Sequence, residues 1–208
     1  MPIRKLLAGN RYFVKNEFKK RISHYKAIAE AQTPTVLWIG CADSRVSESV
    51  VTWSRPGTIF VHRNVANIVA FNDVNIAATI DYAVSYLKIP DIVVCGHTRC
   101  GGIAAIEDGV NENYIADWLL IAAGAKERVD QLARERGLSR EQKLDLLAEE
   151  NVRLQIKHLK AFSLIRNLHR RGELPRVHGW LNSVDDGGIK VVADGRPGAA
   201  SEGLSDSA

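Results

Sequence analysis

Two short segments of the 208-residue chain carry side chains that could bind a metal ion. Residues 41–45 (CADSR) and residues 97–102 (HTRCGG) each follow a short apolar run. Thiolates together with an imidazole select Zn²⁺ over Mg²⁺ or Ca²⁺. The spacing of His97 and Cys100 lets both side chains reach one ion from a single turn. Together with Cys41 they make three candidate ligands, the number used by catalytic zinc sites that keep a fourth position for water.

Asp43 and Arg45 lie beside these candidate ligands. If the chain stays extended through Ala42, the side chains of Cys41, Asp43 and Arg45 point to one side. A guanidinium group keeps a neighbouring carboxylate ionised and oriented. Such a carboxylate could accept a hydrogen bond from metal-bound water, or rotate onto the metal as a fourth ligand. The alternative is an ordinary surface ion pair, which contributes little to stability and does not explain the position next to Cys41.

A structural role is the alternative for the metal-binding residues as well. Cys41 and Cys100 could be core cysteines, and His97 a buried histidine with its hydrogen bonds satisfied. Cys95 lies within an apolar run, which favours a role as a small buried hydrophobe. The placement of the other three residues beyond two separate apolar runs, next to an Asp–Arg pair, favours the metal site.

Short apolar runs predict the buried strands of a mainly parallel sheet, at residues 35–40, 59–62 and 91–96. Apolar residues at helical spacing over 75–88 predict a βαβ unit. Residues 179–192, interrupted by a DDGG turn, predict a hairpin at the sheet edge. We therefore predict an α/β fold with a central, mostly parallel sheet flanked by helices. Ligands gather beyond the carboxyl ends of such strands, so the sheet would bring the two motif segments together.

Further helices are predicted around this sheet. One begins just past Gly102, and another covers 126–136 and stops at Gly137. Ser139 with Gln142 forms a capping box that opens a long helix to about Arg171. Its apolar positions are expected in the core: Leu144, Leu147, Ile156, Leu159 and Ile165. The basic, amphipathic segment 1–25 predicts one or two helices.

The composition excludes several classes of protein. Apolar residues make up 46% and charged residues 25% of the chain, as in folded globular proteins. The 28 basic and 24 acidic residues leave a net charge of +4, which does not favour a nucleic-acid partner. No apolar stretch is long enough to cross a membrane. Three cysteines do not make a secreted disulfide framework, so a reducing compartment is expected. The N-terminal segment lacks a secretory signal pattern, and Glu17 argues against a mitochondrial transit peptide.

The motifs resemble those of the β-class carbonic anhydrases. The resemblance is carried by Cys-x-Asp-x-Arg at 41–45, His-x-x-Cys-Gly-Gly at 97–102, and His-Arg-Asn-Val-Ala-Asn at 62–67 between them. It extends from about Leu7 to Val192. It implies an enzyme that hydrates CO₂ reversibly to bicarbonate and a proton, using hydroxide on one zinc ion per chain.

The resemblance also assigns roles to particular residues. It implies that Cys41, His97 and Cys100 hold the zinc and that Asp43 and Arg45 are the catalytic dyad. The substrate pocket it implies contains Gln32, Phe60, Val65 and Tyr86, and the peptide groups of Gly101 and Gly102 could approach a bound anion. That pocket lies across a dimer interface in the family, so some of these side chains would come from a partner chain.

The resemblance has consequences for assembly and location. We expect a dimer or a dimer of dimers, with residues 1–30 as a helical arm that packs on a partner subunit. Residues 1–193 are expected to form a single α/β zinc-enzyme domain and 194–208 a flexible tail. The expected location is the cytoplasm, or alternatively the mitochondrial matrix. Neither nucleic acid nor membrane is an expected partner.

A narrower resemblance concerns regulation. Trp38, Arg63 and Tyr82 match positions at which one subgroup binds bicarbonate outside the catalytic site. In that subgroup bicarbonate favours a closed state in which the dyad aspartate ligates zinc. Ordinary core aromatics and a structural arginine are the alternative. Two departures from the family pattern are Ala42, where Ser is usual, and segment 47–49, where Ser47 could cap a helix instead.

Three other functions remain open at this point. Relatives of the family hydrolyse CS₂ or COS, linear molecules that suit the same site. A zinc-stabilised binding module without enzymatic activity would need a fourth protein ligand under all conditions. A bicarbonate sensor using Trp38, Arg63 and Tyr82 would make catalysis secondary.

Overall fold

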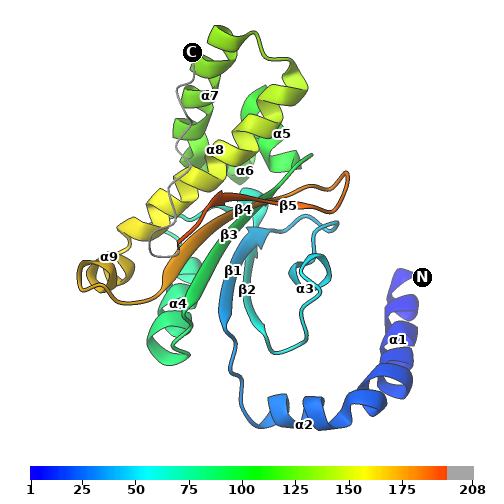
Figure 1. Cartoon of the computed structure of the whole chain (residues 1–208). Coiled ribbons are helices and arrows are strands. Elements are labelled where there is room, and N and C mark those ends of the chain that lie inside the picture. The colour runs from blue at the N-terminus through cyan, green and yellow to red at the C-terminus, as the bar shows by residue number, and fades with distance from the viewer. Residues whose placement is uncertain (196–208) are drawn as a thin grey trace. The chain divides into compact units, whose positions relative to one another are not determined.

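The computed structural model describes residues 1–195, which form two compact units, Met1–Thr33 and the part that begins at Pro34 (Figure 1). The first unit contains the helices α1 (Pro2–Phe13) and α2 (Ile22–Glu30), joined by a π-helical turn at Val14–Phe18 and a 3₁₀ turn at Lys19–Arg21. The helices predicted for the N-terminal segment are thus confirmed.

The first unit has little interior of its own. No residue of Met1–Thr33 is buried, and the apolar side chains of Ile3, Leu6 and Leu7 are more than half exposed. These three residues share one face of α1 because their spacing is helical. Between the two helices, Phe18 of the π-helical turn stacks on Tyr25 of α2 with ring centroids 4.8 Å apart.

The second unit is built around a five-stranded sheet with the order β2-β1-β3-β4-β5. The strands are β1 (Val36–Cys41), β2 (Ile59–Asn64), β3 (Asp91–His97), β4 (Arg176–Asn182) and β5 (Ile189–Ala193). The first four are parallel, and β5 runs antiparallel to β4 at the edge. The predicted fold class is confirmed, including the hairpin at the C-terminal edge. β4 is longer than the sequence predicts, since it begins at Arg176.

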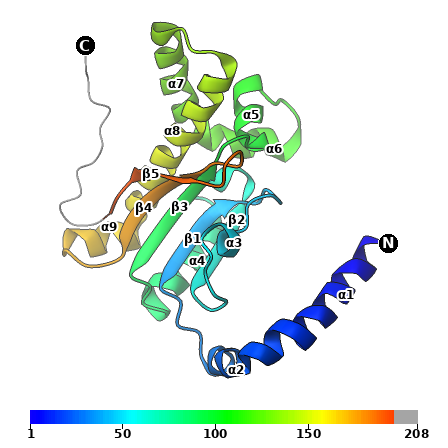
Figure 2. The same ribbon diagram turned by 45° about the vertical axis from the view of Figure 1, so that its right-hand side comes forward.

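The two faces of the sheet are covered unequally. One face packs against α4 (Val74–Asp81), α5 (Gly101–Asp108) and α8 (Arg140–Ala161), and the large core lies between them. Figure 2 shows α8 crossing the sheet with α7 (Ala123–Arg136) beside it. The opposite face carries a small cluster around Trp38, Val93, Cys95 and Trp180, beside the short helix α3 (Glu48–Val51). The remaining elements are η3 (Val65–Asn67), η4 (Tyr82–Tyr86), α6 (Asn113–Leu119), η5 (Leu120–Ala122) and α9 (Ser163–Arg170).

The predicted helix ends around α8 are largely confirmed. Gly137 ends α7 in the left-handed conformation at φ 63°, and Ser139 with Gln142 forms the capping box. The continuous helix predicted to Arg171 is wrong, because Phe162 leaves helical geometry at ψ 134° and a separate helix, α9, follows. The Phe162 ring stacks on Phe71 at 5.2 Å. This contact between residues far apart in the sequence accompanies the break.

The apolar positions of α8 and α9 lie where the sequence places them. Leu147, Ile156, Leu159 and Ile165 are buried, and Leu144 packs partly buried against the same core. The helix predicted just past Gly102 begins at Gly101. The tail predicted at 194–208 falls outside the described residues except for its first two positions. Within residues 1–195, no helix combines the length and apolar character needed to cross a bilayer.

Candidate metal centre

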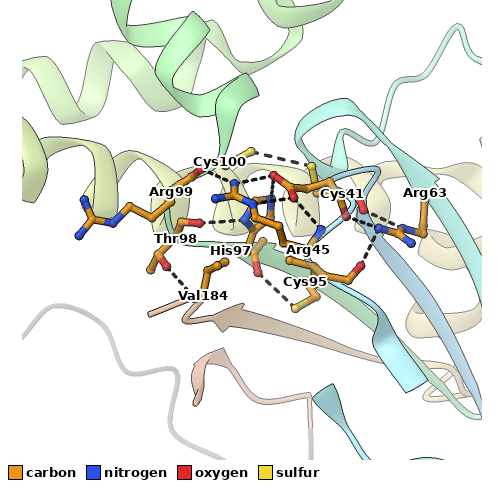
Figure 3. Close-up of polar contacts among 12 residues, drawn as sticks. Cys41, Arg45, Arg63, Cys95, His97, Thr98, Arg99, Cys100 and Val184 are labelled. Carbon is orange, nitrogen blue, oxygen red and sulfur yellow. Dashed lines mark hydrogen bonds and ion pairs between the residues drawn. The ribbon is translucent and has the colours of Figure 1, made fainter. Parts of the chain in front are cut away.

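Three buried side chains meet where β1 and β3 end. β1 ends at Cys41, and its parallel neighbour β3 ends at His97, so both side chains reach the same edge of the sheet. Cys100 occupies the N-cap position of α5, three residues after His97. The potential ligand atoms of these residues all lie within 4.8 Å of one another (Figure 3). The sequence prediction that the two motif segments meet is therefore confirmed.

The spacing of these atoms fits a tetrahedral ion. The Sγ atoms of Cys41 and Cys100 are 3.9 Å apart. Two thiolates on one tetrahedral zinc lie about 3.8 Å apart, given the usual zinc–sulfur bond length. The Nδ1 atom of His97 donates to the carbonyl of Thr98 at 2.8 Å, and its buried Nε2 makes no hydrogen bond within the described part of the chain. This arrangement is typical of a metal-ligating histidine, in which one ring nitrogen donates a hydrogen bond and the other is available to the metal.

The two thiols are hydrogen-bonded to each other, and this shifts their pKa values in opposite directions. The hydrogen bond with Cys100 lowers the pKa of Cys41 well below that of a free thiol. The same hydrogen bond, reinforced by burial, raises the pKa of Cys100. Cysteine binds a metal as the thiolate, so metal binding at this place would release protons.

Cys95 does not belong to this group. It lies on the opposite face of the sheet with Trp38 and Val93, and its Sγ donates to the carbonyl of Gly96 at 3.3 Å. Burial raises its pKa to about 12. A thiol in that state is a small core side chain, as the sequence indicates.

The Asp43–Arg45 pair forms through a turn. The Arg45 backbone N–H donates to Asp43 Oδ1 at 3.0 Å, which closes a two-residue Asx turn directly after β1. The chain keeps its pairing with β2 as far as Ala42, whose N–H donates to the carbonyl of Asn64 at 2.8 Å, and it turns only at Asp43. Asp43 and Arg45 therefore pair through the turn. Ser47 stands at the N-cap of α3, but its side chain makes no capping hydrogen bond among the described residues.

The side chains of this turn form a bidentate ion pair beside the candidate metal ligands. Arg45 Nε donates to Asp43 Oδ1 at 2.9 Å, and Arg45 Nη2 donates to Asp43 Oδ2 at 2.7 Å. These hydrogen bonds hold the pKa of the Asp43 carboxyl far below its usual range. Asp43 Oδ2 lies 3.8 Å from Nε2 of His97. An ionised, oriented acceptor thus lies next to the position that a metal would take.

Arg63 holds the backbone of the same loop. Its Nε donates to the carbonyl of Cys41 at 2.8 Å, and its Nη2 donates to the carbonyls of Asp43 and Val46, each at 2.6 Å. One guanidinium therefore ties three carbonyls between the end of β1 and the start of α3 (Figure 3).

The structure does not bring Tyr82 to Trp38 and Arg63. Trp38 is buried on the α3 face of the sheet, where its ring meets Trp180 at 5.9 Å. Tyr82 packs instead against Phe60 at 5.9 Å, and Phe60 belongs to the core on the opposite face. Alternate residues of a strand point to opposite faces, so the sheet itself separates the two aromatic groups.

Part of the predicted pocket lies beside the ligands. Gly102 is so close to Val65 that a Cβ atom at Gly102 would lie 3.0 Å from Val65 Cγ1. A Cβ at Gly101 would meet open space. A cavity of about 410 Å³ is lined by Cys100 and Gly101 on one side. Its charged rim comes from Arg99, Arg140, Glu141 and Asp145.

The other predicted pocket residues lie elsewhere. On β2, Asn64 pairs with Cys41, whereas Phe60 pairs with Leu37. Phe60 therefore lies four residues, about 13 Å along the strand, from the position next to Cys41. Tyr86 stacks on Tyr82 at 5.6 Å and is 72% exposed. Gln32 belongs to the first unit, where it is exposed. Phe60 and Tyr86 therefore do not lie around the metal ligands of their own chain.

A buried polar ladder behind the site is absent from the sequence prediction. Asn151 Nδ2 donates to the carbonyl of Ala66 at 2.9 Å, and Gln155 Nε2 donates to Asn151 Oδ1 at 2.8 Å. Gln155 Oε1 then accepts from the Val69 backbone N–H at 2.8 Å. These bonds hold a segment in which Ala66 has the unusual φ of 62° for a non-glycine residue. The signal in the sequence is a polar pair at i and i+4 on the face of α8 that carries Leu147.

Two thiols and an imidazole beside an arginine-held carboxylate, at the carboxyl ends of parallel strands in an α/β unit, are typical of a zinc-binding site. The carbonic anhydrase family model matches residues 36–189 of the chain. A carbonic anhydrase of Synechococcus elongatus is 32% identical over 198 residues, covering 92% of this chain and 72% of that protein. A carbonic anhydrase of Pseudomonas aeruginosa is 33% identical over 196 residues, covering 91% and 87%.

A solved structure agrees with these sequence relatives. One of the structures described as two tetrameric β-carbonic anhydrases from Sordaria macrospora superposes with a TM-score of 0.86 at 33% identity. It covers 94% of this chain and 99% of the other. The chain belongs to the β-class carbonic anhydrase family. It is therefore an enzyme with a group of residues able to bind the metal on which that family depends.

Proposed function

We propose that the chain catalyses the zinc-dependent, reversible hydration of CO₂ to bicarbonate and a proton, with one zinc per chain. The observation that carries this proposal is the Cys41–His97–Cys100 group next to the arginine-held carboxylate of Asp43. Zinc at such a site supplies a Lewis acid that makes water nucleophilic near neutral pH, as is well known for carbonic anhydrases. A pair of thiolates leaves less positive charge on the ion than neutral ligands do, so activity should rise towards alkaline pH.

The chain's own residues supply orientation in this mechanism. The Asp43 carboxylate accepts a hydrogen bond from the attacking water, and Arg45 keeps that carboxylate ionised and turned towards the site. Val65 provides an apolar wall for a non-polar substrate, and the missing side chains at Gly101 and Gly102 let peptide N–H groups approach the anionic product.

Self-association would complete the pocket. Phe60 and Tyr86 do not surround the metal ligands of their own chain, which supports a pocket shared between two chains. The similarity to proteins described as tetrameric supports a dimer or a dimer of dimers, with residues 1–30 as the arm that packs on a partner. The exposed apolar face of α1 supports the same role. The cytoplasm, or alternatively the mitochondrial matrix, stays the predicted location.

Inhibition by bicarbonate is the finer part of this proposal. Arg63 supports it, since an anion that drew its guanidinium away would release the carbonyls of the loop that carries Asp43. Trp38 lies on the same face of the sheet as Arg63, whereas Tyr82 does not. The proposal therefore relies on Trp38 and Arg63, without Tyr82.

A side-by-side stopped-flow assay tests the substrate. We expect the zinc-loaded protein to hydrate CO₂ quickly and to leave CS₂ and COS largely unchanged. A preference for CS₂ or COS would make it a hydrolase of the same family. Full zinc loading without turnover of any of these substrates would favour a zinc-stabilised binding module instead.

A further inference from the structure

We propose that Asp185 and Glu141 are positioning residues for the reaction, because they clamp Arg99 and thereby align the carbonyl that holds Arg45. This inference rests on the proposed catalytic role of the Asp43–Arg45 pair. It adds two residues outside the family motifs, one from the β4–β5 turn and one from the first turn of α8.

The contact between Arg99 and Arg45 is made by the main chain. Arg45 Nη2 donates to the carbonyl of Arg99 at 2.9 Å, and the same nitrogen donates to Asp43 Oδ2 at 2.7 Å. Arg99 has φ 56°, a left-handed conformation that non-glycine residues rarely adopt. Such a conformation persists only where the surroundings hold it.

The side chain of Arg99 supplies that hold. Its Nε lies 3.3 Å from Asp185 Oδ1, and its Nη2 lies 2.6 Å from Glu141 Oε1. One guanidinium therefore joins the turn after β3 to two separate elements.

Asp185 reaches the neighbouring residue as well. Thr98 Oγ1 donates to Asp185 Oδ2 at 3.4 Å. The same oxygen accepts from the Val184 backbone N–H at 2.9 Å (Figure 3). The Thr98 backbone N–H donates to the carbonyl of Asn182 at 2.9 Å. The β4–β5 turn thus holds both residues whose carbonyls fix the site, since Thr98 accepts from His97 and Arg99 accepts from Arg45.

The contacts of Arg99 with Asp185 and Glu141 are exposed, so they can be removed with little effect on the stability of the fold. The side chains of Arg99, Asp185 and Glu141 are 52%, 55% and 63% exposed. Exposed ion pairs contribute little to stability. Their effect on a hydrogen bond to Arg45 is different, because small misplacements of catalytic groups reduce rates strongly.

The test compares Asp185→Ala with Asp186→Ala in the zinc-loaded protein. Asp186 lies in the same turn, and its Oδ1 accepts from the Gly188 backbone N–H at 2.8 Å, so its loss disturbs the turn without touching Thr98 or Arg99. We expect Asp185→Ala to lower kcat for CO₂ hydration about three- to tenfold, with zinc content and KM unchanged. Asp186→Ala should keep the wild-type kcat. Equal kcat values for the two variants would overturn the proposal.

A second comparison traces the effect to Arg45. In an Arg45→Ala background, Asp185→Ala should cause no further loss of kcat, because the Arg45 side chain that donates to the Arg99 carbonyl is then absent. The same fractional loss in both backgrounds would contradict the proposal. If Asp185→Ala does not fold, Glu141→Gln on α8 gives the same pair of comparisons. A wild-type kcat in Asp185→Ala, together with an inactive Asp43→Asn variant, would overturn the proposed role of Asp185 and leave the catalytic role of the Asp43–Arg45 pair supported.

Discussion

The carboxylate of Asp43 and the guanidinium of Arg45 face each other along two parallel hydrogen bonds, of 2.9 Å and 2.7 Å. This geometry leaves the carboxylate ionised and aimed, with one oxygen 3.8 Å from the bare nitrogen of His97. The turn directly after β1 brings the two side chains together, so their position depends on local sequence. Their function depends on the metal ligands beside them.

Asp43→Asn tests that pair. The amide keeps the size of the side chain but loses the negative charge, so we expect zinc content to stay the same while kcat falls on the order of 10²-fold. Stopped-flow CO₂ hydration with metal analysis of the same sample measures both. Unchanged turnover would reduce the pair to a structural role.

Cys41→Ser tests the ligand assignment, with Cys95→Ser as its matched control. Both replace a buried sulfur with oxygen, but Cys95 lies on the opposite face of the sheet. We expect Cys41→Ser to lose stoichiometric zinc and most of its activity, and Cys95→Ser to retain both. Retention of full metal and full rate by Cys41→Ser would contradict the assignment.

Arg63→Ala tests regulation by bicarbonate. Since Arg63 ties three carbonyls of the Asp43 loop, we expect the variant to lose inhibition by bicarbonate at low pH and to hold the loop less firmly. Inhibition curves at pH 6 to 7 measure this, with Arg55→Ala, an exposed arginine near α3, as the control. Absence of inhibition in the wild type would remove the regulatory proposal.

Asp91 predicts a pH dependence of stability. Arg176 binds its carboxylate through two hydrogen bonds of 2.6 Å, and His178 adds a third contact, so the pKa of Asp91 is lowered in the folded chain. Its contribution is therefore complete above the unfolded value of about 3.9 and is lost as pH falls through the lower folded pKa.

The matching variant is Asp91→Asn. We expect its Tm at pH 7 to be lower by a few degrees, with the difference from wild type shrinking below about pH 4. Thermal unfolding of both proteins across pH 3 to 8 checks this. A difference that grew on acidification would have the wrong sign.

Gln155→Leu tests the polar ladder behind the site. The change leaves the buried Val69 N–H and the side-chain Oδ1 of Asn151 without their hydrogen bonds to Gln155, so we expect a loss of about 2–3 kcal/mol in the free energy of unfolding. Lys157→Leu, an exposed position on the same helix, is the control and should change stability little. Urea unfolding of the zinc-loaded proteins gives both values.

Local patterns predicted much of this molecule because they act over a few residues. The capping box at Ser139, the helix stop at Gly137 and the strands ending at Cys41 and His97 all follow from neighbouring side chains. The metal group was predictable as well, since adjacent parallel strands deliver their last residues to one edge.

Contacts between distant segments account for what the sequence did not predict. The helix break at Phe162 coincides with stacking on Phe71, and Asp185 meets Arg99 across 86 positions. Within one chain, Tyr82 and Trp38 lie on opposite faces of the sheet, and the sequence alone does not show which face a helix covers.

X-ray absorption at the zinc edge, on protein purified with its metal at pH 8, tests the central claim most directly. The account predicts one zinc per chain, bound by two sulfurs, one imidazole nitrogen and one further light atom from solvent. A chain without stoichiometric metal would contradict it, and so would a fourth protein ligand that stays bound at every pH.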